Sequence, residues 1–280
     1  MPTPARNPFP LAIITDFGYR DHYPGVVKGV IASIAPRATV IDITHGIPAQ
    51  SIVAGAIALR ESWRYFPPRT VFLAVVDPGV GTARAPIAIE TRAGARFVGP
   101  DNGVLWLAAN QAGIKKIVKL TSLRHRLTNV SATFHGRDIF APVAAHLARG
   151  LDITEVGDKI DLADLVSLPA PTSRVQDGEA EGEVMSVDRF GNVQLSIAAS
   201  EAGRMGIGLG SNVVVRCGRR QLTLPYLETF ASVAPGELVA YTDSAGLISL
   251  AVNAGDAAQQ LGLPPGAHVR LTVTPSAAAQ

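Results

Sequence analysis

The sequence predicts an α/β fold class with two domains: an N-terminal domain built on a mainly parallel sheet, and a smaller C-terminal domain that is β-rich and barrel-like. Three observations lead to this prediction. Short β-branched runs alternate with helical patterns in the first half, a proline-rich break follows at 168–173, and short strands separated by turns fill the remainder. The length of 280 residues fits two domains of about 150 residues each.

The N-terminal domain is expected to cover residues 1–165 and to contain βαβ units and a catalytic loop. Strands separated by about 10 to 15 residues of helical pattern are typical of such units and of a parallel sheet. The first elements are expected as strands at 11–15, 40–43 and 71–76 and as helices at 23–34 and 50–65. The same alternation continues through the segments 87–90, 96–98, 104–112, 116–120 and 138–149.

The C-terminal domain is expected to cover residues 179–280, after a proline-rich linker at 166–178. Turn residues recur there between short strands at about ten-residue spacing, as they do in sandwiches and barrels. Strands are expected at 181–188, 193–196, 212–216, 220–223, 238–242, 247–252 and 268–273. Only 254–261 has a helical pattern in this part of the chain.

Composition and charge argue against several classes of protein. The net charge of +2 comes from 25 basic and 23 acidic residues spread along the chain, so no basic stripe is available for nucleic acid. The apolar runs have the length of a strand, whereas a membrane helix needs about 18 residues or more. The single cysteine, Cys217, forms no intrachain disulfide, and the first ten residues lack a secretory signal. We therefore expect a cytoplasmic protein with no nucleic-acid and no membrane partner.

Polar residues follow several of the predicted strands directly. Asp16 comes after the first strand, the loop 77–84 comes after the strand at 71–76, and another polar loop follows at 99–103. Ligands of open parallel sheets bind beyond the carboxyl ends of the strands, so a small-molecule site is expected at this edge. Taken alone, Asp16 fits two roles equally well: a carboxylate that binds both hydroxyls of a ribose, or a cap for the next helix.

Asp77 and Arg84 lie on one loop that Pro78, Gly79 and Gly81 allow to bend. The two side chains can therefore meet although seven positions separate them. An aspartate beside a guanidinium remains ionised and fixed, which suits a residue that orients water. A purely structural ion pair is the alternative. The loop is not a phosphate-binding P-loop, because no Gly-Lys-Ser/Thr follows.

His135 precedes the helix expected at 138–149. A histidine at a helix N-terminus is near free backbone N–H groups, which disfavour its protonated form, so His135 is expected to be neutral. An ordinary surface histidine remains the alternative. The sequence spacing gives His45, His125 and His146 no carboxylate or histidine partner suited to metal binding, so we expect no metal and no cofactor.

Two turns of the C-terminal domain carry polar residues. Asp188 and Asn192 lie in the first turn, and Tyr241 and Ser244 border the second. Each segment is compatible with an ordinary β-turn, in which Asp or Asn bonds the local backbone. Together they also offer acceptors for an ammonium group and a hydroxyl for a carboxylate.

The set of motifs along the chain resembles the S-adenosyl-L-methionine hydroxide adenosyltransferase family, relatives of the bacterial fluorinase and chlorinase. The resemblance runs from about residue 11 to 273 and is carried by five ordered motifs: Thr15-Asp16-Phe17-Gly18, Asp77-Pro78-Gly79-Val80-Gly81-Thr82 with Arg84, Phe134-His135-Gly136-Arg137-Asp138, Phe190-Gly191-Asn192 and Ala251-Val252-Asn253.

This resemblance implies a hydrolysis in which water or hydroxide attacks the ribose 5′ carbon of S-adenosyl-L-methionine and releases adenosine and L-methionine. Relatives are thought to clear the unwanted sulfonium epimer. By resemblance, Asp77 acts as general base, and Arg84 and His135 hold and orient the water.

The resemblance also implies the residues that bind the substrate and the assembly. Asp16 takes the ribose hydroxyls, Asp188 and Asn192 the ribose and methionine side, Tyr241 and Ser244 the amino-acid end, and the backbone from Val252 to Ala254 the adenine. Family members are homotrimers with the site between one subunit's first domain and its neighbour's second domain.

Two other functions remain open at this point. A halogenase is the first, but the fluorinating relatives have a tyrosine where Asp77 stands and a serine where His135 stands, and a carboxylate repels a halide. The residue after Ser244 is Ala245, where those relatives have an arginine, which weakens the expected contact to the methionine carboxylate. A non-catalytic adenosine-binding protein, with Asp77 and Arg84 as a plain ion pair, is the second.

Overall fold

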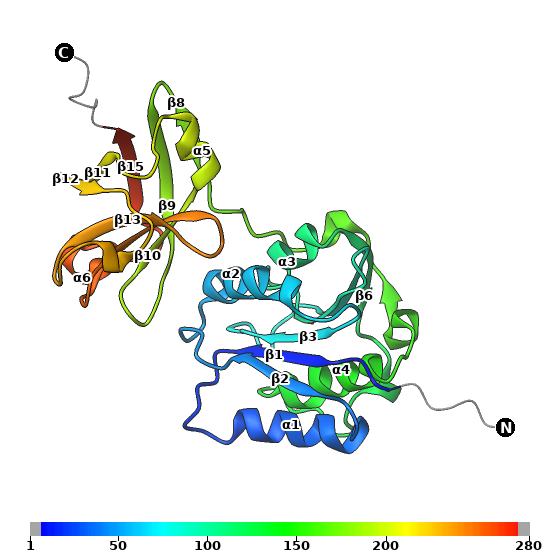
Figure 1. The fold of residues 1–280 in the computed structure, drawn as a ribbon. Coiled ribbons are helices and arrows are strands. Elements are labelled where there is room, and N and C mark those ends of the chain that lie inside the picture. Colours follow the sequence, from blue (N-terminus) through cyan, green and yellow to red (C-terminus); the bar gives the residue numbers. More distant parts are fainter. Residues whose placement is uncertain (1–6, 274–280) are drawn as a thin grey trace, which may run out of the picture. The chain divides into compact units, whose positions relative to one another are not determined.

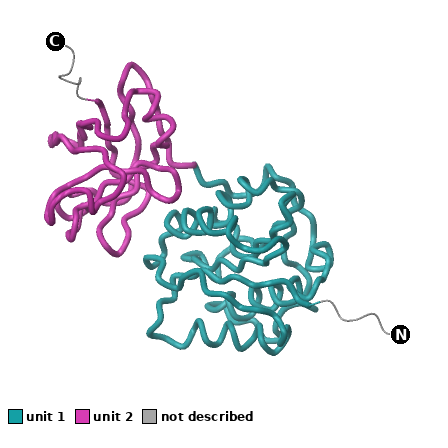
Figure 2. Tube along the Cα trace, viewed as in Figure 1, with its two compact units in different colours: residues 1–169 teal, residues 170–280 magenta. Residues whose placement is uncertain are grey.

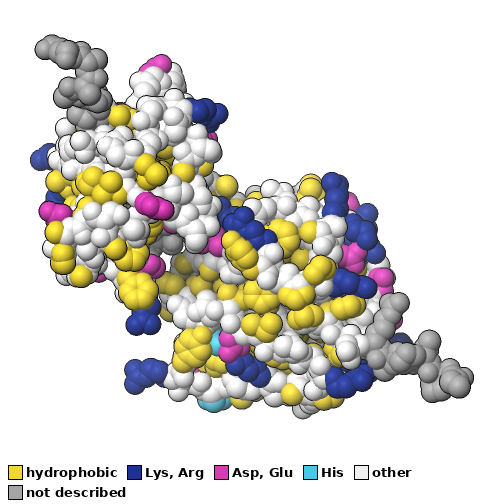
Figure 3. Space-filling view, viewed as in Figure 1, with side chains coloured by type: hydrophobic (Ala, Val, Ile, Leu, Met, Phe, Trp, Pro, Cys, Tyr) yellow, Lys and Arg dark blue, Asp and Glu magenta, His cyan; other side chains and the backbone are white. Residues whose placement is uncertain are grey.

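The structure, a computed structural model, describes residues 7–273. The chain divides into two compact units, Met1–Pro169 and Ala170–Gln280 (Figure 2). On the face seen in Figure 3, basic and acidic side chains are interspersed over both units, as expected from the nearly balanced charge. No helix within residues 7–273 is long and apolar enough to cross a membrane.

The first unit is built on a seven-stranded sheet in the order β2-β1-β3-β5-β4-β6-β7. The pairs formed by β1, β2, β3 and β5 are parallel, whereas β4 is antiparallel to both β5 and β6. Five strands therefore run in one direction and only β4 and β7 oppose them, so the expected mainly parallel sheet is confirmed. The strands are β1 (Leu11–Thr15), β2 (Val40–Thr44), β3 (Val71–Val75), β4 (Pro86–Thr91), β5 (Arg96–Pro100), β6 (Ile114–Lys119) and β7 (Asp158–Lys159).

Helices cover both faces of this sheet (Figure 1). Because successive strand residues point to opposite faces, Leu11 and Ile13 pack on one side and Ala12 and Ile14 on the other, all fully buried. The first face packs against α1 (Tyr23–Ile34) and α4 (Ala141–Ala148), and the second against α2 (Ile52–Ser62) and α3 (Trp106–Gln111). Burial on both faces explains why the central strand β3 is continuously apolar and its neighbour β1 is apolar up to Thr15.

Short helical turns complete the first unit. The 3-10 turns are η1 (Trp63–Tyr65), η2 (Leu123–His125), η4 (Ile153–Val156) and η5 (Leu162–Asp164). The helix expected at 138–149 differs from the prediction, because it begins as a π-helical turn, η3 (Gly136–Phe140), and only then continues as α4.

The second unit is an eight-stranded antiparallel sheet in the order β12-β11-β15-β9-β10-β14-β13, with β8 added on β9. A bridge between Tyr226 and Ala240 links the two ends of this order, so the sheet nearly closes into the expected barrel. Its interior holds alternate residues of the strands, such as Val193, Leu195 and Ile197. The strands are β8 (Arg174–Gln176), β9 (Glu179–Val187), β10 (Val193–Ala198), β11 (Asn212–Cys217), β12 (Arg220–Pro225), β13 (Leu238–Thr242), β14 (Leu247–Val252) and β15 (His268–Val273).

The sequence predicts one helix in this unit, at 254–261, but the structure has two α-helices among the described residues of the unit. The structure has α6 (Ala257–Leu261) but also α5 (Ala199–Arg204), as well as the 3-10 turn η6 (Phe230–Ser232). Six residues that include Gly203 are too few to display a helical period, which is why α5 escaped detection. Strand β8 lies within the segment that was expected to be a linker.

Candidate active site

The loop 77–84 crosses the carboxyl end of the sheet. It leaves β3 and enters β4, and β5 lies between these two strands. Two consecutive turns shape it, with Val80 N donating to Asp77 O at 3.2 Å and Thr82 N to Gly79 O at 3.1 Å. At its far end, Asp101 N donates to Ala85 O at 2.8 Å and joins the loop to the end of β5. The loop is thus held at both ends and by internal turns.

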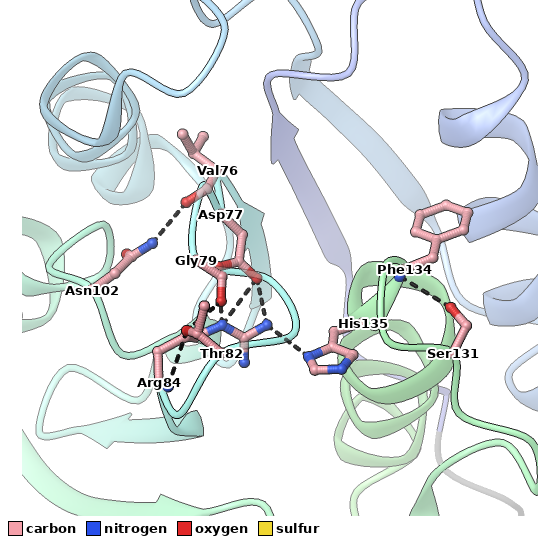
Figure 4. A network of polar contacts seen from close by, with 9 residues as sticks. All are labelled: Val76, Asp77, Gly79, Thr82, Arg84, Asn102, Ser131, Phe134 and His135. Carbon is pink, nitrogen blue, oxygen red and sulfur yellow. Dashed lines mark hydrogen bonds and ion pairs between the residues drawn. The ribbon is translucent and has the colours of Figure 1, made fainter.

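Asp77 and Arg84 form a forked ion pair (Figure 4). The Nε atom of Arg84 lies 2.9 Å from Oδ1 and 3.0 Å from Oδ2 of Asp77, and Nη2 also donates to Oδ2. Only 9% of the Arg84 side chain and 5% of the Asp77 side chain are exposed. A guanidinium fork and a carboxylate match in geometry, so the pair fixes the orientation of both groups.

Gly81 brings this loop against the segment before His135. Its φ of +79° is in the left-handed region, and an added Cβ would lie only 2.6 Å from the backbone oxygen of Ala132. Any residue with a side chain would therefore force the two segments apart. The close approach at Gly81 explains how His135, 51 positions after Arg84, reaches the ion pair.

His135 is the third member of the network. Its Nδ1 atom lies 2.8 Å from Nη2 of Arg84. Arginine has no acceptor, so Nδ1 must be the acceptor and the neutral ring carries its proton on Nε2. Burial, together with the positive charge of Arg84, lowers the pKa of His135 below its ordinary value of 6.5. The ring is therefore neutral at pH 7, which agrees with the sequence expectation.

The helix start that carries His135 is tightly fixed. His135 is the residue before the π-turn η3, and Gly136 packs so closely on the end of β3 that its Cβ would lie 3.4 Å from Val75 Cγ1. Asp138 is fully buried and accepts from Ser131 N at 2.8 Å and from the guanidinium of Arg137. These contacts hold the segment 131–138 while leaving the imidazole directed at Arg84.

Asn102 holds the backbone next to Asp77 in place. The sequence placed Asn102 in the loop after a strand but gave it no role. Its Nδ2 atom donates to the carbonyl of Val76 at 2.9 Å, and its Oδ1 accepts from Val104 N at 3.1 Å. Figure 4 shows this contact on the side of the loop away from His135. Asn102 therefore ties the residue before Asp77 to the loop that follows β5.

Asp16 lies immediately after β1, the strand that neighbours β3 in the sheet. The helix cap that the sequence left open as its role is excluded, because His22 occupies the N-cap of α1. One carboxylate oxygen, Oδ2, accepts from Gln50 N at 2.8 Å. Asp16, Asp77 and Arg84 thus belong to the same carboxyl edge of the sheet.

Asp188 and Asn192 lie on the turn between β9 and β10, and Tyr241 is the next-to-last residue of β13. Asp188 accepts from Phe190 N at 2.8 Å and from Asn192 N at 2.9 Å, and Asn192 Nδ2 donates to its other oxygen at 2.8 Å. Burial, then the charges of Asp188 and Asp243, raise the pKa of Tyr241.

The remaining residues of this unit differ in exposure. Ser244 is exposed on the turn between β13 and β14. Val252 is buried at the end of β14, and Ala254 is exposed with an unusual φ of +55°. Within the second unit, hydrogen bonds therefore join Asp188 and Asn192.

Two histidine environments differ from what the sequence spacing indicated. Nε2 of His45 lies 3.3 Å from a carboxylate oxygen of Asp42, and the rings of His125 and His146 lie 5.0 Å apart. Among residues 7–273, however, no group of three or more His, Cys, Asp or Glu side chains is arranged to hold a metal ion.

The network offers a defined chemistry. Each oxygen of a carboxylate has two lone pairs, so Asp77 retains acceptor capacity beyond its bonds to Arg84. His135 presents an Nε2–H donor, and the formal charges of Asp77 and Arg84 cancel. Such an arrangement suits a neutral molecule that both donates and accepts hydrogen bonds, above all a water molecule, better than an anion.

Comparison with known families and proteins covers most of the chain. Residues 11–157 match the model of the SAM hydroxide adenosyltransferase N-terminal domain, and residues 182–270 match that of the C-terminal domain of the same family. An (R)-S-adenosyl-L-methionine hydrolase from Salinispora tropica is 42% identical over 265 residues, which is 94% of this chain and 97% of that protein.

A more distant relative and a solved structure complete the comparison. A fluorinase from Actinopolyspora mzabensis is 29% identical over 94% of this chain and 96% of its own length. The crystal structure of an uncharacterised conserved protein from Thermotoga maritima has a TM-score of 0.90 and 40% identity, covering 94% of this chain and 99% of that one.

Proposed function

Because the chain belongs to the SAM hydroxide adenosyltransferase family, we propose that it hydrolyses S-adenosyl-L-methionine to adenosine and L-methionine. The observation that carries the proposal is the network of Asp77, Arg84 and His135 at the carboxyl edge of the first sheet. We further propose that the substrate is the (R)-sulfonium epimer, which the name of the 42% identical relative specifies.

The reaction requires little more than a correctly placed water. Its oxygen attacks the ribose 5′ carbon, the C–S bond breaks, and the electron pair goes to sulfur, which leaves as the neutral thioether of methionine. One proton of the water passes to the carboxylate of Asp77 and then to solvent, and adenosine keeps the new hydroxyl. Since the sulfonium is already a good leaving group, alignment of the water accounts for much of the catalysis.

Arg84 and His135 orient the water and do not exchange protons with it. Arg84 fixes both oxygens of Asp77, and a guanidinium group has N–H donors but no acceptor for a proton of the water. His135 uses Nδ1 to accept from Arg84, so Nε2–H is the group available to donate to the water oxygen. A donor on the oxygen and an acceptor on the hydrogen define the direction of the remaining lone pair, which is the one that attacks.

The substrate contacts are proposed from the family pattern and from the side chains present. Asp16 binds the ribose hydroxyls, while Asp188 and Asn192 bind the ribose and the methionine ammonium. Tyr241 and Ser244 contact the amino-acid end, and the backbone of Val252 and Ala254 contacts adenine. We propose that the active protein is a cytoplasmic homotrimer in which a neighbouring subunit completes each site, so that a monomeric variant is inactive.

The proposal is tested by incubating the purified protein with S-adenosyl-L-methionine of each epimer and separating the products by chromatography. We expect adenosine and methionine in equal amounts, faster from the (R) epimer, with an activity loss of about a hundredfold or more in Asp77→Asn. Arg204→Lys is the control, because the Arg204 side chain at the end of helix α5 is exposed. Equal turnover by wild type and Asp77→Asn would exclude the proposed role of Asp77.

The same reaction mixture tests the halogenase alternative. Because one distant relative is a fluorinase, chloride or fluoride is added to the mixture as the competing nucleophile. A halogenase would form 5′-halo-5′-deoxyadenosine, whereas the hydrolase continues to form adenosine. Adenosine that binds tightly without any turnover would instead support the non-catalytic binding protein.

A further inference from the structure

A chain of polar side chains lies behind Asp16 and takes no part in the proposed reaction. Nδ1 of His45 is 2.8 Å from the hydroxyl of Thr15, and Nε2 of His45 is 3.3 Å from Oδ1 of Asp42. Lys28 donates to the other oxygen of Asp42 at 2.6 Å. Thr15 is fully buried and His45 is 1% exposed, so this chain leads from the surface into the core beside the sheet edge.

The direction of the hydrogen bonds in this chain follows from its ends. The carboxylate of Asp42 lies 3.3 Å from Nε2 of His45, a charge contact and not a hydrogen bond, and its negative charge favours the neutral ring that carries its proton on Nε2 and presents Nδ1 as an acceptor. The hydroxyl of Thr15 therefore donates to Nδ1, and its oxygen accepts from Phe17 N at 3.2 Å. Burial favours this neutral ring by lowering the pKa of His45.

Asp42, His45 and Thr15 are arranged like the acid, base and nucleophile of a hydrolytic triad, but they do not form one. A nucleophile must reach its substrate, and the exposed fraction of Thr15 is 0%. What the hydroxyl does reach is the backbone of Phe17, two residues further along the chain. The chain of contacts therefore acts on the conformation of the segment that contains Asp16.

The same histidine also binds this segment through its backbone. Gly18 N donates to the carbonyl of His45 at 2.7 Å, and the N–H of His45 donates to the hydroxyl of Tyr19 at 3.1 Å. Asp16 lies between these contacts and itself accepts from Gln50 N at 2.8 Å. With the bond between Thr15 and His45 and that from Ile47 N to the Thr15 carbonyl at 3.4 Å, five hydrogen bonds join the segments 15–19 and 45–50 around the carboxylate.

We propose that His45 is a positioning residue for ribose recognition: through Thr15 it fixes the turn that presents the carboxylate of Asp16 to the two ribose hydroxyls. The inference rests on the proposed function, in which Asp16 binds the ribose. The buried hydroxyl of Thr15 makes both of its bonds, to His45 and to Phe17, and together these bonds specify one geometry of the turn.

Two replacements of His45 separate its hydrogen bond to Thr15 from its charge contact with Asp42. The amide of asparagine occupies the place of the Nδ1 side of the ring and keeps the bond to Thr15, whereas glutamine reaches toward Nε2 and keeps only the contact with Asp42. Thr15→Ser and Thr15→Val form a second pair, which retains or removes the hydroxyl without altering His45. Thermal unfolding of each variant reports whether it folds.

The readout is the ratio of dissociation constants for adenosine and 2′,3′-dideoxyadenosine, measured by calorimetry. We expect the wild type, His45→Asn and Thr15→Ser to prefer adenosine strongly, and His45→Gln and Thr15→Val to lose about tenfold of that preference. In the two variants that lose this preference, KM for S-adenosyl-L-methionine should rise while kcat changes little. A loss of packing alone would weaken both ligands equally.

The outcomes separate this inference from the proposed function. A protein that binds adenosine with the expected preference but turns nothing over contradicts the function and leaves the inference standing. If folded His45→Gln and Thr15→Val both keep the wild-type ratio, the inference is overturned even though hydrolysis continues. If His45→Gln does not fold, the pair at Thr15 decides the question.

Discussion

Arg84 and His135 are joined by a hydrogen bond of 2.8 Å that has only one possible direction. The guanidinium donates, so Nδ1 of His135 carries a lone pair and cannot carry a proton while the bond exists. Protonation of His135 would place two cations in contact and break the network on the side away from Asp77. The state of one imidazole nitrogen therefore decides whether the site is assembled.

A pH profile of kcat/KM tests this relationship. Burial and Arg84 lower the pKa of His135, so the neutral, active form persists below the ordinary value of 6.5 and activity falls as the pH drops through the lowered pKa. His135→Asn, whose amide oxygen still accepts from Arg84, should lack this acid limb. A limb centred above 6.5, or one that is unchanged in His135→Asn, contradicts the assignment.

Arg84→Lys tests whether the fork matters beyond its charge. An ammonium group cannot contact both oxygens of Asp77 and Nδ1 of His135 at once, so we expect kcat/KM to fall about a hundredfold while the protein remains folded. Steady-state kinetics and thermal unfolding check this. Arg204→Lys serves as control, because 71% of that side chain is exposed. Full activity in Arg84→Lys would show that only the positive charge of Arg84 matters and not its fork geometry.

Gly81→Ala tests the close approach between the loop and the segment before His135. The added methyl group would meet the carbonyl of Ala132 at 2.6 Å, and the φ of +79° adds strain. We expect a loss of about 1 to 3 kcal/mol in the free energy of unfolding, together with a lower kcat.

Gly29→Ala is the matched glycine control. Gly29 lies within α1, and an added Cβ has no neighbour within 4 Å. Alanine there should stabilise the protein by about 0.5 to 1 kcal/mol and leave kcat unchanged. Equal destabilisation by the two substitutions in urea denaturation would argue against a special role for Gly81.

Asn102→Asp tests the support behind Asp77. The aspartate can still accept from Val104 N but cannot donate to the carbonyl of Val76, so two acceptors face each other. We expect kcat to fall about tenfold, with a smaller change in KM, because the position of Asp77 changes and not the substrate contacts. Kinetics of Asn110→Asp, an exposed position on α3, provide the comparison.

The residues of the candidate site that lie at strand ends could be predicted from the sequence. Asp16, Asp77 and Arg84 could be found because polar residues that directly follow apolar strands stand out, and the parallel sheet gathers such ends at one edge. The bounds of α1 and of β1 were predicted without error for the same reason, since their apolar periods begin and stop sharply.

Other features depend on contacts between distant segments and could not be predicted. Asn102 was recognised only as a residue after a strand, because its partner, the Val76 carbonyl, lies 26 positions away. His45 lacked an obvious partner in the sequence, yet it contacts Thr15 across 30 positions. The meeting of Arg84 and His135 became visible only through the family pattern, and its geometry requires Gly81.

The reversed direction of β4 has a consequence for protein engineering. Because the loop leaves β3 and enters β4 on the other side of β5, both of its ends belong to paired strands of the sheet. A library that keeps Gly81 and randomises the other positions of 78–83 at constant length should keep the sheet while altering the surroundings of the proposed attacking water. Insertions or deletions would instead displace Arg84, two residues before β4, and are the less promising route to enzymes that use other nucleophiles.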